Sequence, residues 1–434
     1  MNKTMALIVA VLLSLPINFA LAADQSEGIY LFRESDTFWM LKGPHARKFA
    51  PGERFKTKLF LKPVMTFPES NANNSSIELK NARLTFWGSP YENLLVLIRL
   101  NFDQFNDRFG AVTGDPSPLP APPPPPTPGL ERATDNNVAD AWIEYTFDQA
   151  LRVRVGQDVV PYGLNIRTPV SQLTFNNRPV WVAQNFVRNR LIRDLQIQTF
   201  GQFGSTDSSL LWSFAILQGT GIGGSSPNTG GSGGLQFRFA NDNNDKKDYA
   251  ARVVWATPVE GLSVGASIYR GKQGNSGDPA DNYLAAGGIT DEKHNGVDLR
   301  YQNGPLWLTL EYNKSDIDKM IVPRSDGRLQ RSGTGDIDDI VLSARYDVTQ
   351  WFTPKFRYER FDSTSTKGAL GDPDRIKGFL PSMDIYTIGA NFNLPTDARH
   401  IRSVIGIEYM MLDELNAASK TDNDEWSVYW AMLY

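Results

Sequence analysis

The chain has 434 residues, of which 41% are hydrophobic, a formal net charge of -4 and no cysteine. Without cysteine, disulfides, thiolate chemistry and Cys-ligated metals are excluded. A mildly acidic balance gives no general footprint for nucleic acid, so we expect no nucleic-acid partner and expect any cationic segment to act locally.

The first 22 residues have the pattern of a secretory signal. Lys3 precedes an apolar run from Met5 to Leu15, and Ala20-Leu21-Ala22 supplies the small residues of a cleavage site. The run is shorter than the ~20 apolar residues of a spanning helix, and no later stretch reaches that length. We therefore expect export and cleavage of residues 1–22. Residues 23–53 predict no clear element and are interpreted as an N-terminal periplasmic segment.

From residue 54 to the C-terminus, apolar and polar residues alternate in short runs. In one of them Ile143 and Tyr145 share a face, while Trp142 and Glu144 share the other. This period of two is typical of strands with one apolar face. The sixteen predicted strands span 54–67, 76–88, 93–105, 138–148, 151–160, 193–203, 208–218, 247–257, 261–271, 294–303, 305–314, 337–347, 350–362, 382–394, 399–412 and 424–434.

The connections between these strands alternate between short and long. The short ones carry turn residues, as in Asn303-Gly304-Pro305. The long ones span 106–137, 161–192, 219–246, 272–293, 315–336 and 363–381. An even strand count, with short turns at one end and long loops at the other, is typical of a bacterial outer-membrane barrel. We expect an all-β fold, a 16-stranded antiparallel transmembrane β-barrel over 54–434 with short periplasmic turns and long extracellular loops.

The faces of the strands favour this barrel over a secreted soluble fold. Several apolar faces end in aromatic residues, which suits the belts at a bilayer interface. The last strand alternates from Trp426 to Tyr434, an ending that resembles the signal for barrel assembly. Lipid cannot hydrogen-bond an open strand edge, so the first and last strands must pair. About sixteen strands then leave a water-filled passage. The proline-rich stretch 116–128 predicts a stiff loop, either a spacer or a docking peptide.

One long connection is strongly cationic. It contains Arg167, Arg178, Arg188, Arg190 and Arg193, with no acidic residue from Val159 to Arg193. Its apolar residues suggest that it folds inward against the barrel wall, which would place the arginines at the constriction of the pore. The alternative is an outward loop whose arginines pair with lipopolysaccharide phosphates. Guanidinium groups stay charged and bind oxyanions bidentately, so an inward loop predicts a modest preference for anions.

The inward faces of the strands carry mixed charge. The predicted lumen-facing basic residues are Lys56, Lys58, Lys62, Arg99, Arg152, Arg154, Arg252, Arg300, Arg345, Lys355, Arg357 and Arg402. The acidic ones are Asp103, Asp140, Glu144, Asp298, Glu311, Asp339, Asp347, Glu359 and Glu408. Because the two sets nearly balance, we expect selectivity to be set by the loop.

No pattern predicts catalysis. His45, His294 and His400 are far apart in sequence and none is expected to meet another, and no His/Asp/Glu spacing makes a convincing metal site. We therefore expect no enzymatic activity, no metal and no cofactor.

Three short stretches resemble a known family, the phosphate-selective porins O and P. They are V-R-V-G-Q-D-V-V-P-Y-G-L from Val153 to Leu164, L-T-F-N-N-R from Leu173 to Arg178, and R-D-L-Q-I-Q from Arg193 to Gln198. The resemblance implies a sixteen-stranded, usually trimeric barrel whose third long loop folds inward. Phosphate specificity in the best-known members comes from a basic ladder and a lysine cluster. Here the long segment has arginines and no lysine. The resemblance therefore supports the fold more strongly than it supports phosphate specificity.

The leading interpretation is an outer-membrane porin, a passive diffusion channel for small hydrophilic solutes with a modest preference for anions, phosphate among them. The expected partners are outer-membrane lipid and lipopolysaccharide, small anionic solutes and two further copies in a homotrimer. The alternative is a structural barrel that sheathes or anchors a partner protein at the outer membrane.

Overall fold

The computed structural model describes a defined part of the chain. This part comprises residues 55–68, 75–91, 93–101, 138–169, 173–182, 193–204, 208–219, 246–273, 290–317, 321–323, 329–331, 335–365, 382–394, 402–415 and 424–433. The predicted signal (1–22), the predicted periplasmic segment (23–53) and the proline-rich stretch (116–128) lie outside the described residues.

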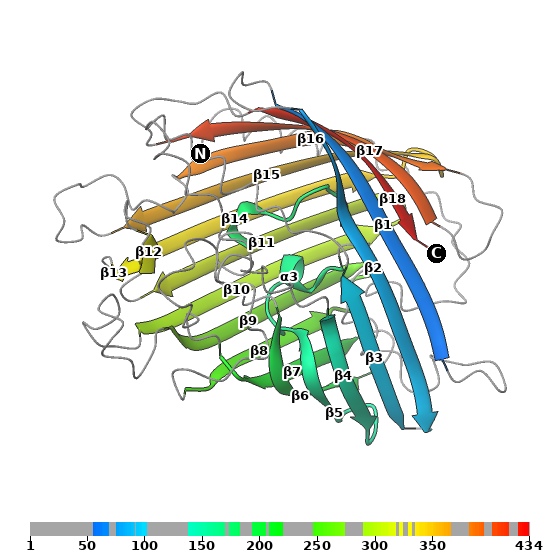
Figure 1. Cartoon of the computed structure of the whole chain (residues 1–434), viewed down its shortest axis with the longest axis vertical. Helices are drawn as coiled ribbons and strands as arrows, with labels where there is room; N and C mark the ends of the chain where they lie inside the picture. The colour runs from blue at the N-terminus through cyan, green and yellow to red at the C-terminus, as the bar shows by residue number, and fades with distance from the viewer. Residues whose placement is uncertain are drawn as a thin grey trace, which may run out of the picture.

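Sixteen antiparallel strands form a closed barrel (Figure 1). They are β1 (Phe55–Pro68), β2 (Ser76–Tyr91), β3 (Leu94–Asn101), β4 (Val138–Thr146), β5 (Arg152–Val159), β6 (Arg193–Gly204), β7 (Ser209–Leu217), β8 (Asp248–Ala256), β9 (Leu262–Gln273), β10 (Thr290–Asn303), β11 (Leu306–Ile317), β14 (Gly335–Tyr346), β15 (Phe352–Ser365), β16 (Met383–Leu394), β17 (Arg402–Glu414) and β18 (Glu425–Leu433). Each pairs with its sequence neighbours, and β1 closes the ring on β18, with Phe60 opposite Leu433. The predicted barrel and its strand count are confirmed.

A small hairpin was not predicted. Between β11 and β14, β12 (Ile321–Pro323) and β13 (Leu329–Arg331) form a two-stranded hairpin separate from the barrel sheet. The sequence predicts only a polar loop there, because three-residue strands are too short to show a period of two.

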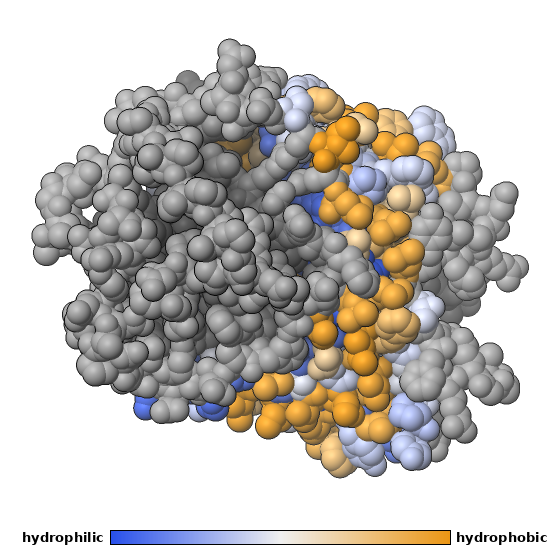
Figure 2. Space-filling view, in the orientation of Figure 1, coloured by the Kyte–Doolittle hydropathy of each residue, from blue (hydrophilic) through white to orange (hydrophobic). Residues whose placement is uncertain are grey.

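The alternation of side chains separates an apolar outer surface from a polar interior. On β4, Ile143 and Tyr145 are 52% and 44% exposed on the outside, whereas Trp142 and Glu144 are buried on the inside. Figure 2 shows a band of hydrophobic residues over β1 to β3. This outside suits lipid, since every strand edge is satisfied by closure of the ring. No helix in the described part of the chain is long and apolar enough to span a membrane.

The connection from β5 to β6 enters the barrel. Its described residues, 160–169 and 173–182, are here called the inserted segment, and it contains the short helix α3 (Leu164–Arg167). Figure 1 shows α3 inside the ring, in front of β10 and β11. Tyr162, Ile166 and Trp181 are almost completely buried, in a cluster with residues of the inner wall such as Tyr269 on β9 and Phe361 on β15. The apolar residues of the segment therefore find their packing partners on the inner wall.

Candidate functional site

Two glycines allow close packing of the backbone, Gly156 within β5 against β4 and Gly163 where the inserted segment meets Glu311 on the opposite wall. Gly156 has a φ of 135°, and a Cβ there would lie 2.2 Å from the carbonyl oxygen of Ala141. Gly163 has a φ of 61°, and a Cβ there would lie 2.6 Å from Oε1 of Glu311. Both conformations are costly for residues with a side chain, so glycine is required for the close approach at both points.

Three inward-facing glutamates hold the backbone of the inserted segment. Glu311 on β11 accepts the N–H groups of Leu164 at 3.1 Å and Asn165 at 3.0 Å. Because these are the first donors of α3, the carboxylate caps a helix whose N-cap residue is Gly163. The other two lie further round the barrel. Glu359 on β15 accepts from Trp181 N at 3.1 Å, and Glu408 on β17 accepts from Asn176 N at 2.7 Å.

Two inward-facing lysines hold carbonyl groups of the same segment. Lys355 Nζ donates to Thr174 O at 2.9 Å and to Oε1 of Glu408 at 2.5 Å. Lys62 Nζ donates to Asn176 O at 3.0 Å. Lys62 is thus inside the barrel, as its alternation implies, and contacts the inserted segment directly. The side chains of Lys56 and Lys58 lie outside the described residues.

Aromatic side chains of the segment close over a buried polar row. The rings of Tyr162 and Trp181 are stacked, 5.7 Å apart. Trp181 Nε1 donates to Ser315 Oγ at 3.1 Å, and Ser315 Oγ lies 2.6 Å from Nδ1 of His294, whose Nε2 lies 2.6 Å from Glu292. This Ser–His–Glu order has the residue types of a hydrolase triad, but Ser315 and His294 are completely buried beneath Trp181. In this geometry the row anchors the segment.

Burial also affects Tyr162 itself. Desolvation, together with the nearby carboxylate of Glu311, raises the pKa of Tyr162 well above its usual value. Its hydroxyl lies 3.4 Å from Oδ1 of Asn313. The phenol therefore remains neutral inside the barrel.

The predicted constriction arginines occupy three kinds of place. Arg167 is buried and donates to Val159 O at 2.7 Å. Arg178 donates to the carbonyl oxygens of Asn165 and Thr168, so it ties the two halves of the inserted segment together. Arg193 begins β6 and forms an ion pair with Asp140 on β4 at 2.6 Å. Arg188 and Arg190 lie outside the described residues.

The arginines on β3 and β5 are paired with carboxylates. Arg154 binds both Glu144, at 2.6 Å, and Asp158, and its guanidinium lies 3.8 Å from the ring centroid of Trp142. Arg152 is buried next to it, 3.9 Å from Glu144. Arg99 shares Asp140 with Arg193, at 2.6 Å. The positive charge on this side of the barrel is therefore largely compensated locally.

On the opposite wall, strand register sorts charges into layers. Arg300 on β10 lies opposite Thr309 on β11, Thr309 opposite Ser343 on β14, and Ser343 opposite Arg357 on β15. These four residues are here called the arginine row. Two residues along each strand, toward the long loops, the same register aligns Asp298, Glu311, Val341 and Glu359. The carboxylates that hold the inserted segment thus lie in one layer and the arginines in the next.

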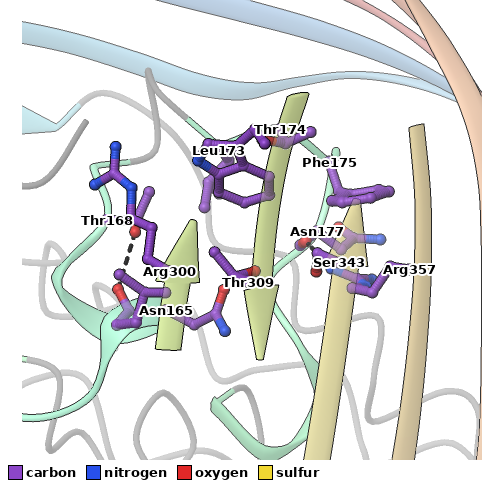
Figure 3. A pocket seen from close by; sticks show the side chains of 12 residues that line it. Asn165, Thr168, Leu173, Thr174, Phe175, Asn177, Arg300, Thr309, Ser343 and Arg357 are labelled. Atoms are coloured by element: carbon purple, nitrogen blue, oxygen red, sulfur yellow. Dashed lines mark hydrogen bonds between the residues drawn. The ribbon is translucent and has the colours of Figure 1, made fainter. Parts of the chain in front are cut away.

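A pocket lies between the arginine row and the inserted segment (Figure 3). Its empty volume is about 470 Å³, part of it open to solvent. Figure 3 shows Arg300 and Arg357 at opposite sides, with Thr309 and Ser343 between them. The segment contributes Leu164, Asn165, Thr168, Leu173, Thr174, Phe175 and Asn177, and Trp307 completes the lining. No carboxylate is among these residues, so the two charged side chains of the lining are both basic.

Arg357 is held in a defined orientation in this pocket. It donates to Asn177 O at 2.8 Å, and its guanidinium lies 4.8 Å from the ring centroid of Phe175. Its Nε is buried and has no hydrogen-bond partner among the described residues. The inward direction of Arg300 and Arg357 follows from alternation. The sequence around each arginine does not reveal that the two lie next to the inserted segment, because this depends on the register of four strands.

A closed sixteen-stranded barrel with an apolar outside, a polar inside and a connection folded into its interior is an outer-membrane porin. The match to the family described as phosphate-selective porin O and P extends over residues 68–328, and the chain belongs to this family. Membership places the protein in the bacterial outer membrane as a passive channel.

Several solved structures share the fold. The anion-selective porin from Comamonas acidovorans is 12% identical, with 88% of this chain and 98% of that chain covered and a TM-score of 0.52. OmpT of Vibrio cholerae in its trimer form is 12% identical, with 88% and 99% covered and a TM-score of 0.51. The outer membrane channel DcaP of Acinetobacter baumannii is 10% identical, with 88% and 97% covered and a TM-score of 0.53. No curated protein sequence matches the chain.

Proposed function

We propose that this porin is a passive diffusion channel for small hydrophilic solutes with a modest preference for anions, and that the arginine row is part of its selective region. The observation that carries the proposal is the pocket lined by Arg300 and Arg357 without a carboxylate. Elsewhere in the interior, arginines such as Arg154 and Arg193 are paired with acidic residues. A guanidinium in a narrow passage lowers the energy of an anion more than that of a cation. The similar fold of an anion-selective porin agrees with this.

The contributions of the five predicted constriction arginines differ in this proposal. Arg167 and Arg178 act by holding the inserted segment in place, and Arg193 acts within its ion pair with Asp140. Attraction of anions by the connection itself rests on Arg188 and Arg190. Phosphate is one candidate solute among small anions.

The reversal potential of the reconstituted channel across a potassium chloride gradient tests the proposal. The wild-type channel is expected to pass chloride more readily than potassium. Exchanging both arginines of the row for glutamine (Arg300→Gln with Arg357→Gln) should move the reversal potential toward the potassium value. Arg360→Gln on β15 is the matched control, because Arg360 is exposed and points away from the interior on the same strand. Potassium preference in the wild-type channel would refute the proposal.

We extend the proposal to the rest of the protein. Residues 1–22 are removed on export, residues 23–53 lie on the periplasmic side, and the barrel contacts outer-membrane lipid and lipopolysaccharide. The trimer form of OmpT supports a homotrimer here. A barrel that sheathes a partner protein is less favoured, because the inserted segment already occupies interior space. No catalytic step is proposed.

A further inference from the structure

The pocket under the inserted segment has two chemically different sides. Arg300 and Arg357 supply positive charge, and the hydroxyls of Thr309 and Ser343 lie between them. Phe175 and Trp307 supply aromatic surface. A small hydrated ion such as phosphate can use only the first side. A ligand that carries both a negative charge and an apolar body can use both.

The aromatic residues also support the arginines of this wall. Arg357 lies over the ring of Phe175 at 4.8 Å, and Arg345 lies over the ring of Trp307 at 5.1 Å. Stacking on a ring fixes the plane of a guanidinium. Carboxylate and phosphate oxygens can both accept bidentately from a guanidinium, so the apolar side of the pocket is what distinguishes one class of anion from another.

We propose that this pocket binds carboxylates attached to a single planar ring, with the carboxylate on an arginine of the row and the ring against Phe175 and Trp307. This inference rests on the proposed anion preference and specifies the class of anion. Neighbouring strands are ~4.8 Å apart, so the α-carbons of Arg300 and Arg357 are separated by roughly 14 Å along the wall. Figure 3 shows the two side chains at opposite sides of the pocket, so a benzoate-sized molecule that crosses it has one arginine on each side. Such a ligand can move from one arginine to the other, and it can dissociate from the pocket readily.

Block of the chloride current tests the inference in the full-length channel reconstituted in planar bilayers. The probes are benzoate, acetate, inorganic phosphate and the uncharged benzamide, each added at constant chloride. Benzoate should halve the current at a concentration about tenfold lower than acetate, a ratio equivalent to roughly 1.4 kcal/mol. Phosphate should need more than benzoate, and benzamide should have no effect, because it lacks the charge.

Phe175→Leu removes the ring and keeps an apolar side chain. It should bring the benzoate concentration that halves the current close to that of acetate. The ratio of the two concentrations is the readout, because a change in the orientation of Arg357 affects both anions alike. Phe203→Leu is the matched control, since Phe203 is 53% exposed on the outer face of β6. A normal chloride current in Phe175→Leu shows that the variant has folded, and Trp307→Leu provides a second test if it has not.

The possible failures are distinguishable. An anion-selective channel in which benzoate and acetate block equally, or phosphate blocks best, overturns this inference and leaves the proposed function intact. A cation-selective channel that none of the anions blocks overturns both. Equal benzoate block in the wild type and in both ring variants would show that the ring binds elsewhere, which also overturns the assignment to this pocket.

Discussion

The backbone N–H of Trp181 donates to Oε1 of Glu359, 178 residues further along the chain, at 3.1 Å. This contact joins the inserted segment to the wall of the barrel that carries the pocket. Glu359 and Glu311 lie in one cross-strand layer and both accept backbone N–H groups of the segment. The position of the segment, and with it the width of the passage, therefore depends on a few carboxylates.

Removal of the helix cap at Glu311 should loosen the segment. Glu311→Ala leaves the N–H groups of Leu164 and Asn165 without their acceptor, and each unsatisfied buried group costs about 1–3 kcal/mol. Single-channel recordings should show larger conductance or added current noise. Glu260→Ala, in an exposed turn, is the control. Unchanged conductance and noise would mean that Glu311 does not hold the segment.

Glycine at position 156 should be essential for assembly of the barrel. In Gly156→Ala the added carbon would meet the carbonyl oxygen of Ala141 at 2.2 Å, in a backbone conformation with φ of 135°. We expect loss of folded barrel, measured as loss of the compact, heat-modifiable form on gels. Gly304→Ala has a positive φ of 54° but nothing within 4 Å, so its cost is limited to about 1 kcal/mol of backbone strain. Equal yields of the two variants would contradict the steric argument.

Substitution by lysine, which keeps the charge, distinguishes the structural role of Arg178 from the electrostatic role proposed for Arg188 and Arg190. Arg178→Lys keeps the charge but cannot reach both Asn165 O and Thr168 O, and one lost hydrogen bond costs about 1 kcal/mol. Current noise should therefore rise while the reversal potential stays the same.

Lysine and glutamine variants of Arg188 and Arg190 provide the comparison for Arg178→Lys. Arg188→Lys and Arg190→Lys should leave both the noise and the reversal potential unchanged, whereas Arg188→Gln with Arg190→Gln should reduce chloride preference. A shift of the reversal potential in Arg178→Lys would argue against its role as a tie within the segment.

Tyr162 should make the barrel less stable at alkaline pH. Its pKa in the folded protein is raised well above the usual value of 10.0, so above about pH 10 the unfolded chain loses this proton while the folded chain retains it. The free energy of unfolding therefore falls as pH rises through this range. In Tyr162→Phe this fall should be smaller, as measured by urea unfolding in detergent at pH 8 and pH 11. An identical pH dependence in both proteins would contradict a raised pKa.

Most of the barrel could be predicted from the sequence because alternation is local. The pattern around Ile143 and Glu144 assigns a face to every residue of that strand without knowledge of its neighbours. Strand ends were less predictable. β10 begins at Thr290, four residues before the predicted start, and pairs there with Gln273. Its first residues are polar, and backbone pairing continues beyond the part of the strand that shows an apolar face.

The candidate site was predictable only in part. The sequence identified the cationic connection and its apolar residues, and it placed Arg300 and Arg357 on the inward face. The register that aligns these two arginines, and the carboxylates that hold the inserted segment, come from strands more than a hundred residues beyond that segment.

The sequence alone therefore determined a closed barrel with an apolar exterior, because a period of two depends only on neighbouring residues. Tertiary structure decided which arginines form ion pairs and which line the pocket. Arg154 and Arg193 form ion pairs with carboxylates, whereas Arg300 and Arg357 line a pocket that also contains hydroxyls and aromatic rings. The physical reason is that a charge is compensated by whatever lies within a few ångströms of it, and in a barrel those neighbours are brought together by register and by the inserted segment.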